Sequence, residues 1–528
     1  MSKIVFNSVS FHYDSPFAPV FEDLSITIDI GWKTGVIGAN GSGKTTLLRL
    51  ISGELEPTEG EVILSGEAFY FPYRPKDAGQ KTLQVIKEGI APFSAWEREM
   101  ERLLEARDER SLARYGEVLA EYERMGGYEI DDRIERELAQ MGMDPELLQR
   151  DFHTLSGGEQ TRALICSLFL KEGAFPLIDE PTNHLDMEGR ALLGEYLARK
   201  EGFILVSHDR YLLDLCVDHI LSIGKGDIRV RRGNYSQWKE NREREEQFER
   251  RRRERLRREI ELLERAARKR RAWAERKERE KIGGGDKGFI GHRAAKLMKQ
   301  ALVIERRISE KIEEKRGLLK DIEKERRLKM FTGPKPPETV LFMDGVTIEL
   351  GGRPVVENFS LTLSRGERIA LLGPNGSGKT TLLRAISGEI EVAEGVIHIP
   401  KYLTVARAYQ EPLWKEGYLR DRLREEGIEE ADFRNIMALL GVRGEVFARP
   451  LETFSEGERK KVDLCRSFLG EAHLFLWDEP LNYLDVMTRE QIERLILEFQ
   501  PTMLFVEHDR YFIERVATGV VRMGSPGR

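Results

Sequence analysis

Two short segments of the chain have the pattern of phosphate-binding loops. Residues 38–45 read GANGSGKT and residues 373–380 read GPNGSGKT, and both fit G-x-x-x-x-G-K-[ST]. The glycines let backbone N–H groups close around phosphate oxygens at the start of a helix. The lysine of such a loop reaches the β- and γ-phosphates, and the hydroxyl after it binds Mg²⁺. The candidate nucleotide-binding residues are Gly38, Asn40, Gly41, Gly43, Lys44, Thr45 and Thr46 in the first loop and Gly373, Asn375, Gly376, Gly378, Lys379, Thr380 and Thr381 in the second.

An Asp-Glu pair ends an apolar run in each half of the chain. The run FPLIDE ends at Glu180 and the run LFLWDE ends at Glu479. Asp179 and Asp478 are expected to hold Mg²⁺, as are the hydroxyls of Thr45 and Thr380 in the loops. The two glutamates are candidate general bases that polarise the attacking water.

The motifs recur in the same order, which predicts a duplicated domain. The two loops start 335 residues apart, whereas LSGGEQTRA and FSEGERKKV, the Asp-Glu pairs, and the histidines of VSHDRYL and VEHDRYF are 299 or 300 residues apart. The repeated register makes His208 and His508 candidates for contact with a γ-phosphate. The shorter later offsets indicate an insertion in the first copy, at about residues 86–133. It reads as charged amphipathic helix and is expected to form an arm, or else a solvated hairpin without a partner.

The elements that must position these residues follow from the same repeat. Each loop follows an apolar stretch and precedes a leucine-rich helical run, so both copies are expected to be α/β domains. We place the first domain at residues 1–237 and the second at residues 333–528.

The intervening segment, residues 238–332, is strongly basic. Residues 241–330 hold 32 Lys and Arg against 19 Asp and Glu, although the whole chain has a net charge of −6. Apolar residues at helical spacing on both sides of a glycine-rich turn predict an antiparallel helical hairpin. Its arms of about 40 residues would reach roughly 60 Å, with the tip at about 282–293. Such a charge balance favours a nucleic-acid or other anionic partner.

Other classes of protein are disfavoured by composition. The three cysteines stand at unrelated spacings, which indicates neither a disulfide framework nor a metal site. The first residues lack the apolar core of a signal peptide, and no apolar run approaches the ~18 residues needed to cross a bilayer. We therefore expect a cytoplasmic protein.

The motifs resemble those of the ATP-binding-cassette (ABC) family. The resemblance implies two ABC-type nucleotide-binding domains, with P-loop cores and helical subdomains, that bind ATP and Mg²⁺ and hydrolyse ATP. It also implies that the domains pair head to tail within one monomer, so that each ATP lies between the phosphate loop of one domain and the serine-glycine signature of the other. The first site would be completed by Ser455, Gly457 and Glu458. The second would be completed by Ser156, Gly157, Gly158 and Glu159, with Gln410 as a further Mg²⁺ contact.

Some positions depart from the family pattern. Tyr73 stands where the first copy should have the counterpart of Gln410, and Glu456 replaces a glycine in the second signature. Tyr13 is a candidate to stack on adenine in the first site, whereas the aligned residue in the second copy is Leu350. We therefore expect two unequal sites that both hydrolyse ATP.

The arrangement of tandem domains, an arm in the first and a charged helical linker is similar to the ABC-F family. This resemblance implies an ATP-bound closed form in the ribosomal E site, with the linker reaching large-subunit rRNA, the P-site tRNA and the peptidyl-transferase centre. The tip, with Phe289 and Ile290, resembles that of antibiotic-resistance members, which protect ribosomes from lincosamides, streptogramin A and pleuromutilins. A housekeeping ABC-F translation factor is the alternative.

Two further classes of cassette protein are disfavoured. The ATPase subunit of an ABC transporter would not require the linker hairpin, and no transmembrane partner is expected. Cassette ATPases that act on DNA either split one cassette around a far longer coiled coil or carry zinc-binding cysteines, and neither feature is present.

Overall fold

The structure is a computed structural model that describes residues 3–14, 17–106, 108–183, 185–224, 227–279, 336–442 and 444–524. The chain divides into two compact units. One contains Met1–Ser236 together with Leu328–Arg528, and the other contains Gln237–Arg327. The first unit therefore holds both motif-bearing segments, which are called here the N-terminal half (up to β9) and the C-terminal half (from β10). The expected linker tip lies outside the described residues.

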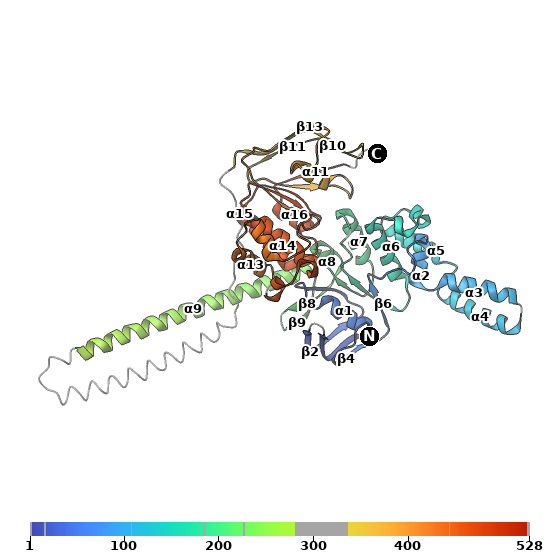
Figure 1. The fold of residues 1–528 in the computed structure, drawn as a ribbon. Coiled ribbons are helices and arrows are strands. Elements are labelled where there is room, and N and C mark those ends of the chain that lie inside the picture. The colour runs from blue at the N-terminus through green and yellow to red at the C-terminus, as the bar shows by residue number, and fades with distance from the viewer. Residues whose placement is uncertain are drawn as a thin grey trace, which may run out of the picture. The chain divides into compact units, whose positions relative to one another are not determined.

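The N-terminal half contains two sheets (Figure 1). An antiparallel sheet has the strand order β2-β1-β4, and a six-stranded sheet has the order β5-β6-β7-β3-β8-β9, with all neighbours parallel except β8 and β9. The strands are β1 (Lys3–Asp14), β2 (Phe17–Asp29), β3 (Lys33–Gly38), β4 (Glu59–Leu64), β5 (Glu67–Phe71), β6 (Ala174–Asp179), β7 (Phe203–Val206), β8 (His219–Gly224) and β9 (Asp227–Arg232).

Helix α1 packs between these two sheets. Leu47 and Leu48 of α1 are fully buried in one core with Phe6 of β1 and with Leu177 and Ile204 of the six-stranded sheet. The helices of this half are α1 (Lys44–Ser52), α2 (Thr82–Ile90), α3 (Phe93–Ala106), α4 (Glu109–Arg124), α5 (Ile130–Gln140), α6 (Gly157–Leu170), α7 (Met187–Ala198) and α8 (Arg210–Cys216), with short 3-10 turns at Pro145–Gln149 and Phe152–Thr154. The parallel strands and enclosed helix place the phosphate loop, between β3 and α1, at the carboxyl edge of the sheet.

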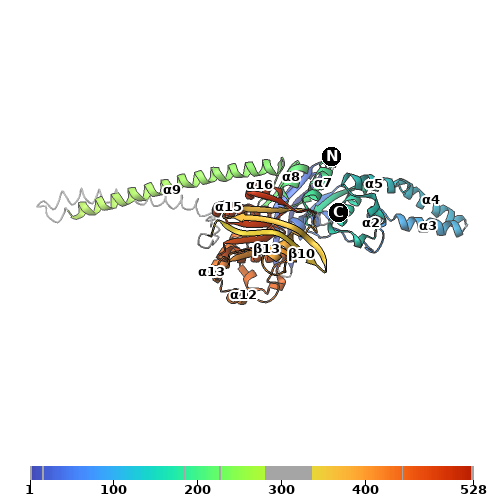
Figure 2. The same ribbon diagram turned by 90° about the horizontal axis from the view of Figure 1, so that it is seen from above.

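The helices α3 and α4 form a pair that projects from this half, side by side in both views (Figures 1 and 2). Tyr122 of α4 donates a hydrogen bond to Glu97 of α3 at 3.0 Å, and Arg114 pairs with Glu99 at 3.0 Å. The pair begins at Phe93, later than the start of the segment expected to form the arm. The reason is that the preceding helix α2 is part of the body, where its apolar residues are buried.

The C-terminal half repeats the architecture. Its antiparallel sheet has the order β11-β10-β13, and its five-stranded parallel sheet has the order β14-β15-β16-β12-β17. The elements are β10 (Thr339–Leu350), β11 (Arg353–Ser364), β12 (Arg368–Leu372), α11 (Lys379–Ile386), β13 (Glu394–His398), β14 (Val405–Ala408), α12 (Leu419–Glu425), α13 (Glu430–Leu439), α14 (Glu456–Leu469), β15 (Leu474–Asp478), α15 (Val486–Phe499), β16 (Met503–Val506), α16 (Arg510–Val516) and β17 (Gly519–Arg522), with 3-10 turns at Gly444–Ala448 and Leu451–Thr453. The expected fold, two α/β domains, is confirmed.

The described part of the linker is one helix, α9 (Tyr235–Arg279) (green in Figure 1). With 45 residues it is about 68 Å long at 1.5 Å per residue. The stripe expected to be apolar is its less exposed face, because Ile260 is buried and Leu256 and Leu263 are half-buried, whereas Arg251 and Arg252 are exposed. The second arm of the expected hairpin lies outside the described residues.

A buried ion cluster joins the two halves. The guanidinium of Arg210, at the start of α8, is 1% exposed and donates to Oδ1 of Asp509 at 3.0 Å. Glu493 of α15 contacts the same guanidinium and is equally buried. Burial opposes the ionisation of Asp509, but Arg210 and Arg489 outweigh it and lower the pKa of Asp509 to about 2. The cluster is therefore ionised at neutral pH and holds the halves in contact.

Candidate functional site

The two phosphate loops have the same local structure. Gly43 and Gly378 are the N-caps of α1 and α11 and have φ of 94° and 85°, a left-handed conformation that glycine adopts without strain. A Cβ at Gly43 would lie 2.5 Å from Cγ1 of Val20. Nζ of Lys44 donates to the carbonyls of the first two loop residues at 3.0 Å, and Nζ of Lys379 does so at 2.9 and 2.8 Å. Each loop is therefore closed around its own lysine, in the position from which it can reach a phosphate.

The residues expected to hold Mg²⁺ lie together in each half. Thr45 donates from Oγ1 to Oδ2 of Asp179 at 2.7 Å. Burial raises the pKa of Asp478, and a hydrogen bond from Thr380 opposes this rise. Oδ1 of Asp478 is buried and has no hydrogen-bond partner within the described residues. A hydroxyl beside a carboxylate with a free oxygen is the kind of oxygen donor set that Mg²⁺ prefers, so the residues fit this ion.

The two candidate bases are held in a strained backbone conformation. Glu180 and Glu479 have φ of 48° and 46°, although the left-handed region costs a residue with a Cβ about 1–2 kcal/mol. Nε2 of His208 lies 3.3 Å from Oε1 of Glu180, and Nε2 of His508 lies 3.2 Å from Oε1 of Glu479. The same strain at both positions indicates that the carboxylates are aimed by the backbone, a feature common in functional sites.

The electrostatic surroundings of the two bases differ. Burial, together with the neighbouring charge of Asp179, raises the pKa of Glu180 to about 7. Burial acts in the same direction on Glu479, but hydrogen bonds from His508 and Asn482 lower its pKa to about 2. Nδ2 of Asn482 donates to Oε2 of Glu479 at 2.6 Å. The second base is therefore the more strongly stabilised as a carboxylate.

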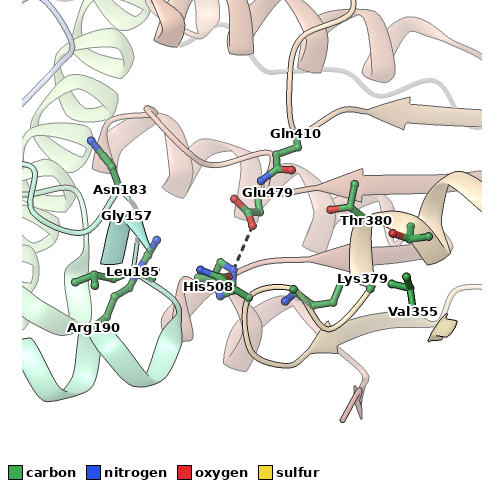
Figure 3. A pocket seen from close by; sticks show the side chains of 14 residues that line it. Gly157, Asn183, Leu185, Arg190, Val355, Lys379, Thr380, Gln410, Glu479 and His508 are labelled. Atoms are coloured by element: carbon green, nitrogen blue, oxygen red, sulfur yellow. Dashed lines mark hydrogen bonds and ion pairs between the residues drawn. The ribbon is translucent and has the colours of Figure 1, made fainter. Parts of the chain in front are cut away.

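The second site is an open pocket formed by both halves (Figure 3). Its volume is about 420 Å³. From the C-terminal half it is lined by Val355, Asn375, Gly376, Gly378, Lys379, Thr380, Thr381, Gln410, Glu479 and His508. From the N-terminal half it is lined by Gly157, Asn183, Leu185 and Arg190. The phosphate loop of one half thus faces the signature of the other, in the head-to-tail arrangement that the sequence predicts.

The first site is closed by direct contacts between the halves. Asn40 of the phosphate loop donates from Nδ2 to the carbonyl of Tyr483 at 2.7 Å and from its backbone N to Oδ2 of Asp485 at 3.2 Å. Lys461 lies 3.6 Å from the same carboxylate. A Cβ on Gly457 would lie 2.9 Å from Nδ2 of Asn40. The second signature therefore lies against the first phosphate loop.

The signature residues begin two helices. Ser156 and Ser455 are the N-caps of α6 and α14, and each forms a reciprocal capping box with the glutamate three residues later, Glu159 or Glu458. Gly158 occupies the second position of α6. These caps fix the helix ends whose glycines, Gly157 and Gly457, approach the opposite phosphate loops. The serines and glutamates bond to each other rather than to the loops.

The positions that depart from the family pattern are placed as follows. Tyr13 is 40% exposed, and its hydroxyl lies 3.1 Å from Oγ1 of Thr46, so its ring borders the first phosphate loop. Leu350 takes the equivalent end of β10 and is also exposed. The hydroxyl of Tyr73 shares a hydrogen bond with Ser167 of α6. Tyr73 therefore bonds within its own half, whereas Gln410 lines the second site.

Sequence reasoning missed two residues that touch the sites. Tyr70 of β5 donates a hydrogen bond to Oδ2 of Asp179 at 2.9 Å. Nζ of the buried Lys460 donates to the carbonyls of Tyr409 and Gln410 at 2.6 and 3.0 Å. For Lys460 no local signal existed, because two consecutive lysines in an amphipathic helix can both lie on its polar face. None of the described helices is long and apolar enough to span a membrane.

Comparisons with known proteins identify the family of the chain. The family described as ABC transporter matches residues 21–183 and 356–482. The ribosome protection protein VmlR of Bacillus subtilis is 29% identical, over 98% of this chain and 86% of its own length. The energy-dependent translational throttle protein EttA of Haemophilus influenzae is 28% identical, over 97% of this chain and 90% of its own.

The fold is also that of a solved structure. In the crystal structure of a complex of the archaeal ribosomal stalk protein aP1 with the ribosome recycling factor aABCE1, one chain matches with a TM-score of 0.61 and 19% identity. The match covers 98% of this chain and 87% of the other.

The segments matched by the family model include both phosphate loops and both Asp-Glu pairs. The chain therefore belongs to the ATP-binding-cassette family and hydrolyses ATP.

Proposed function

We propose that this ATPase acts on the ribosome and protects it from antibiotics. In this proposal the ATP-bound, closed form binds the E site, and the linker reaches the P-site tRNA and the peptidyl-transferase centre. The observation that carries the proposal is the 29% identity to a ribosome protection protein along almost the entire chain, linker included. A similarity confined to the two ATPase halves would support hydrolysis alone.

Hydrolysis itself would use the two sites as follows. Lys44 and Lys379 would bind the β- and γ-phosphates, and Glu180 and Glu479 would accept the proton of the attacking water. When bound, Mg²⁺ would neutralise charge that develops on the phosphate oxygens. In the second site, Nε2 of His508 lies 3.2 Å from Oε1 of Glu479. His508 would orient that carboxylate and could donate to the γ-phosphate. Because each site needs residues of both halves, ATP binding would favour the closed form.

The charge of α9 supports an RNA partner. Arg251, Arg252, Arg255, Arg257 and Arg258 are exposed along one stretch of a helix about 68 Å long. Arginines on such a surface bind phosphate through charge-assisted hydrogen bonds. A helix of this length can enter an RNA cavity that the compact halves cannot.

A housekeeping role in translation is the second candidate. It is favoured by the 28% identity to the translational throttle protein, which also extends over almost the entire chain. Both candidate functions require ATP hydrolysis, ribosome binding and the linker. They differ in whether the linker changes drug binding.

The test of ribosome binding is a variant that binds ATP without hydrolysing it. Glu180→Gln combined with Glu479→Gln should reduce turnover by orders of magnitude and trap the closed form. With ATP present, this variant should co-sediment with ribosomes in a sucrose gradient and inhibit translation. The control adds Lys44→Ala and Lys379→Ala, which should abolish co-sedimentation. A trapped variant that stays at the top of the gradient at low salt would refute the ribosomal function.

The drug question needs a separate measurement. Expression of the parent protein should raise the drug concentration that stops growth for lincosamides, streptogramin A or pleuromutilins. Phe289→Ala with Ile290→Ala, at the tip expected from the sequence, should abolish this protection and leave ATP turnover unchanged. Ribosome binding without any change in drug tolerance would favour the housekeeping role.

A further inference from the structure

The carboxylate of Asp179 is held by two hydroxyl groups. Its Oδ2 accepts one hydrogen bond from Thr45 of the phosphate loop at 2.7 Å and another from Tyr70 at 2.9 Å. Tyr70 lies on β5, which runs parallel to β6, and its register partner there is Leu177, two residues before Asp179. The hydroxyl thus approaches the carboxylate from the neighbouring strand. Both lone-pair directions of Oδ2 are used, and Oδ1 remains for another contact.

The second site lacks this contact. The register partner of Leu476, two residues before Asp478, is Arg407, so Arg407 takes the place of Tyr70. Its guanidinium contacts Glu389 and donates to Ser387 at 2.7 Å, and it stacks on a tyrosine ring, so it turns away from Asp478. Oδ1 of Asp478 has no hydrogen-bond partner within the described residues. The two aspartates therefore differ in how firmly they are fixed.

The first site also lacks the glutamine that lines the second. Gln410 faces the second pocket, whereas the hydroxyl of Tyr73, three residues after Tyr70, bonds to Ser167. The segment that supplies the amide of Gln410 to the second site supplies the phenol of Tyr70 to the first. Tyr70 stands three residues before the counterpart of Gln410, and it bonds to Asp179. In the first site the aspartate is fixed before a nucleotide binds.

We propose that Tyr70 is a positioning residue for Asp179, and that it makes the first site selective for Mg²⁺-bound ATP. This inference rests on the use of Mg²⁺ proposed above. With Oδ2 fixed by Thr45 and Tyr70, the carboxylate of Asp179 is already ordered and loses little rotational freedom when the ion binds. The second site has to order Asp478 when the ion and nucleotide bind.

The test is the gain in ATP affinity that Mg²⁺ produces at the first site alone. Lys379→Ala disables the second phosphate loop, and binding of a fluorescent ATP analogue is then measured with Mg²⁺ and with EDTA. Tyr70→Phe should reduce the Mg²⁺-dependent gain about tenfold, as expected for a lost hydrogen bond to a charged group, and leave the affinity in EDTA unchanged. In a Glu479→Gln background, the same substitution should raise the Mg²⁺ concentration for half-maximal turnover and leave the maximal rate unchanged.

Two matched controls accompany this variant. Tyr73→Phe removes a similar hydroxyl that bonds to Ser167, and it should leave the Mg²⁺-dependent gain unchanged. Arg407→Leu, measured in a Lys44→Ala background, should leave the gain at the second site unchanged. An equal loss of affinity in Mg²⁺ and in EDTA, or no loss at all, would overturn the role of Tyr70. If the parent protein gains no affinity from Mg²⁺, the underlying proposal of Mg²⁺ use fails instead.

Discussion

Nζ of Lys460 donates to the main-chain carbonyl of Gln410 at 3.0 Å, so a lysine of the signature helix holds the segment that supplies the glutamine of the second site. The same ammonium donates to the carbonyl of Tyr409 at 2.6 Å. Lys460 is only 2% exposed, and burial lowers its pKa. Its charge is therefore stabilised in the interior by these carbonyl groups and by nearby carboxylates, chiefly those of Asp463 and Glu507.

We expect Lys460→Met to loosen this segment. Two buried carbonyls would lose their donor, which should lower the free energy of unfolding by about 2–3 kcal/mol. ATP affinity at the second site, measured in a Lys44→Ala background, should fall, and affinity at the first site should not. Lys415→Met is the control, because Lys415 is exposed and pairs only with Glu411 on the surface. Equal effects of the two substitutions would contradict the assigned role.

The buried cluster at Arg210 makes a second prediction. Arg210→Met would leave the carboxylates of Asp509 and Glu493 buried without their shared partner, which should cost about 3–5 kcal/mol in urea unfolding. The matched control is Arg510→Met, at the equivalent position of the C-terminal half. Arg510 is half exposed, pairs with Glu514 and lies over the ring of Tyr211, so its loss leaves no buried acid unpaired and should cost only about 1–2 kcal/mol. A loss below about 1 kcal/mol in the free energy of unfolding of Arg210→Met would show that the cluster does not stabilise the contact between the two halves.

A third prediction concerns the shape of the first phosphate loop. Gly43→Ala would force a Cβ into left-handed backbone and against Val20, 2.5 Å away. We expect this variant to lose ATP binding at the first site and several degrees of thermal stability. Gly53→Ala is the control, because Gly53 has a similar φ of 75° but open space around its Cβ position, so only the backbone cost of about 1–2 kcal/mol applies. Identical melting temperatures for the two variants would argue against the steric explanation.

The fourth prediction concerns the linker helix. If α9 binds RNA phosphates, the logarithm of the ribosome affinity should fall linearly with the logarithm of salt concentration. Replacing Arg251, Arg252 and Arg257 with glutamine should reduce that slope by about one per lost phosphate contact. Three arginines of α12, at 420, 422 and 424, serve as the control for a general change in charge. An unchanged slope in the linker variant would remove these arginines from the RNA contact.

The sequence predicts the parts of the sites that depend on short-range patterns. The phosphate loops, the Asp-Glu pairs and the histidines lie next to recognisable strands, and their repetition gives the fold. Tyr70 was not predicted, because its contact with Asp179 depends on the register of two strands about a hundred residues apart. The departure at Tyr73 is visible from spacing, but its hydrogen bond to Ser167 follows from the packing of α6, which no local pattern reveals.

The buried ion cluster around Arg210 could not be predicted from the sequence for a related reason. Arg210 and Arg510 occupy the same position in two copies of one motif, so the repeat suggests equal roles. Their surroundings differ because the position of Glu493 in α15 corresponds to Gly194 in α7. A contact made by only one copy cannot be inferred from a pattern that both copies share.

The buried ion cluster around Arg210 also favours the pairing of one N-terminal half with one C-terminal half. Arg510, the equivalent residue of the C-terminal half, lies over the ring of Tyr211 in the N-terminal half and pairs with Glu514 of its own helix. Two N-terminal halves would offer Arg210 a glycine and no acid at the position of Glu493. Association of two N-terminal halves is thereby disfavoured, because each Arg210 would be buried with one carboxylate fewer.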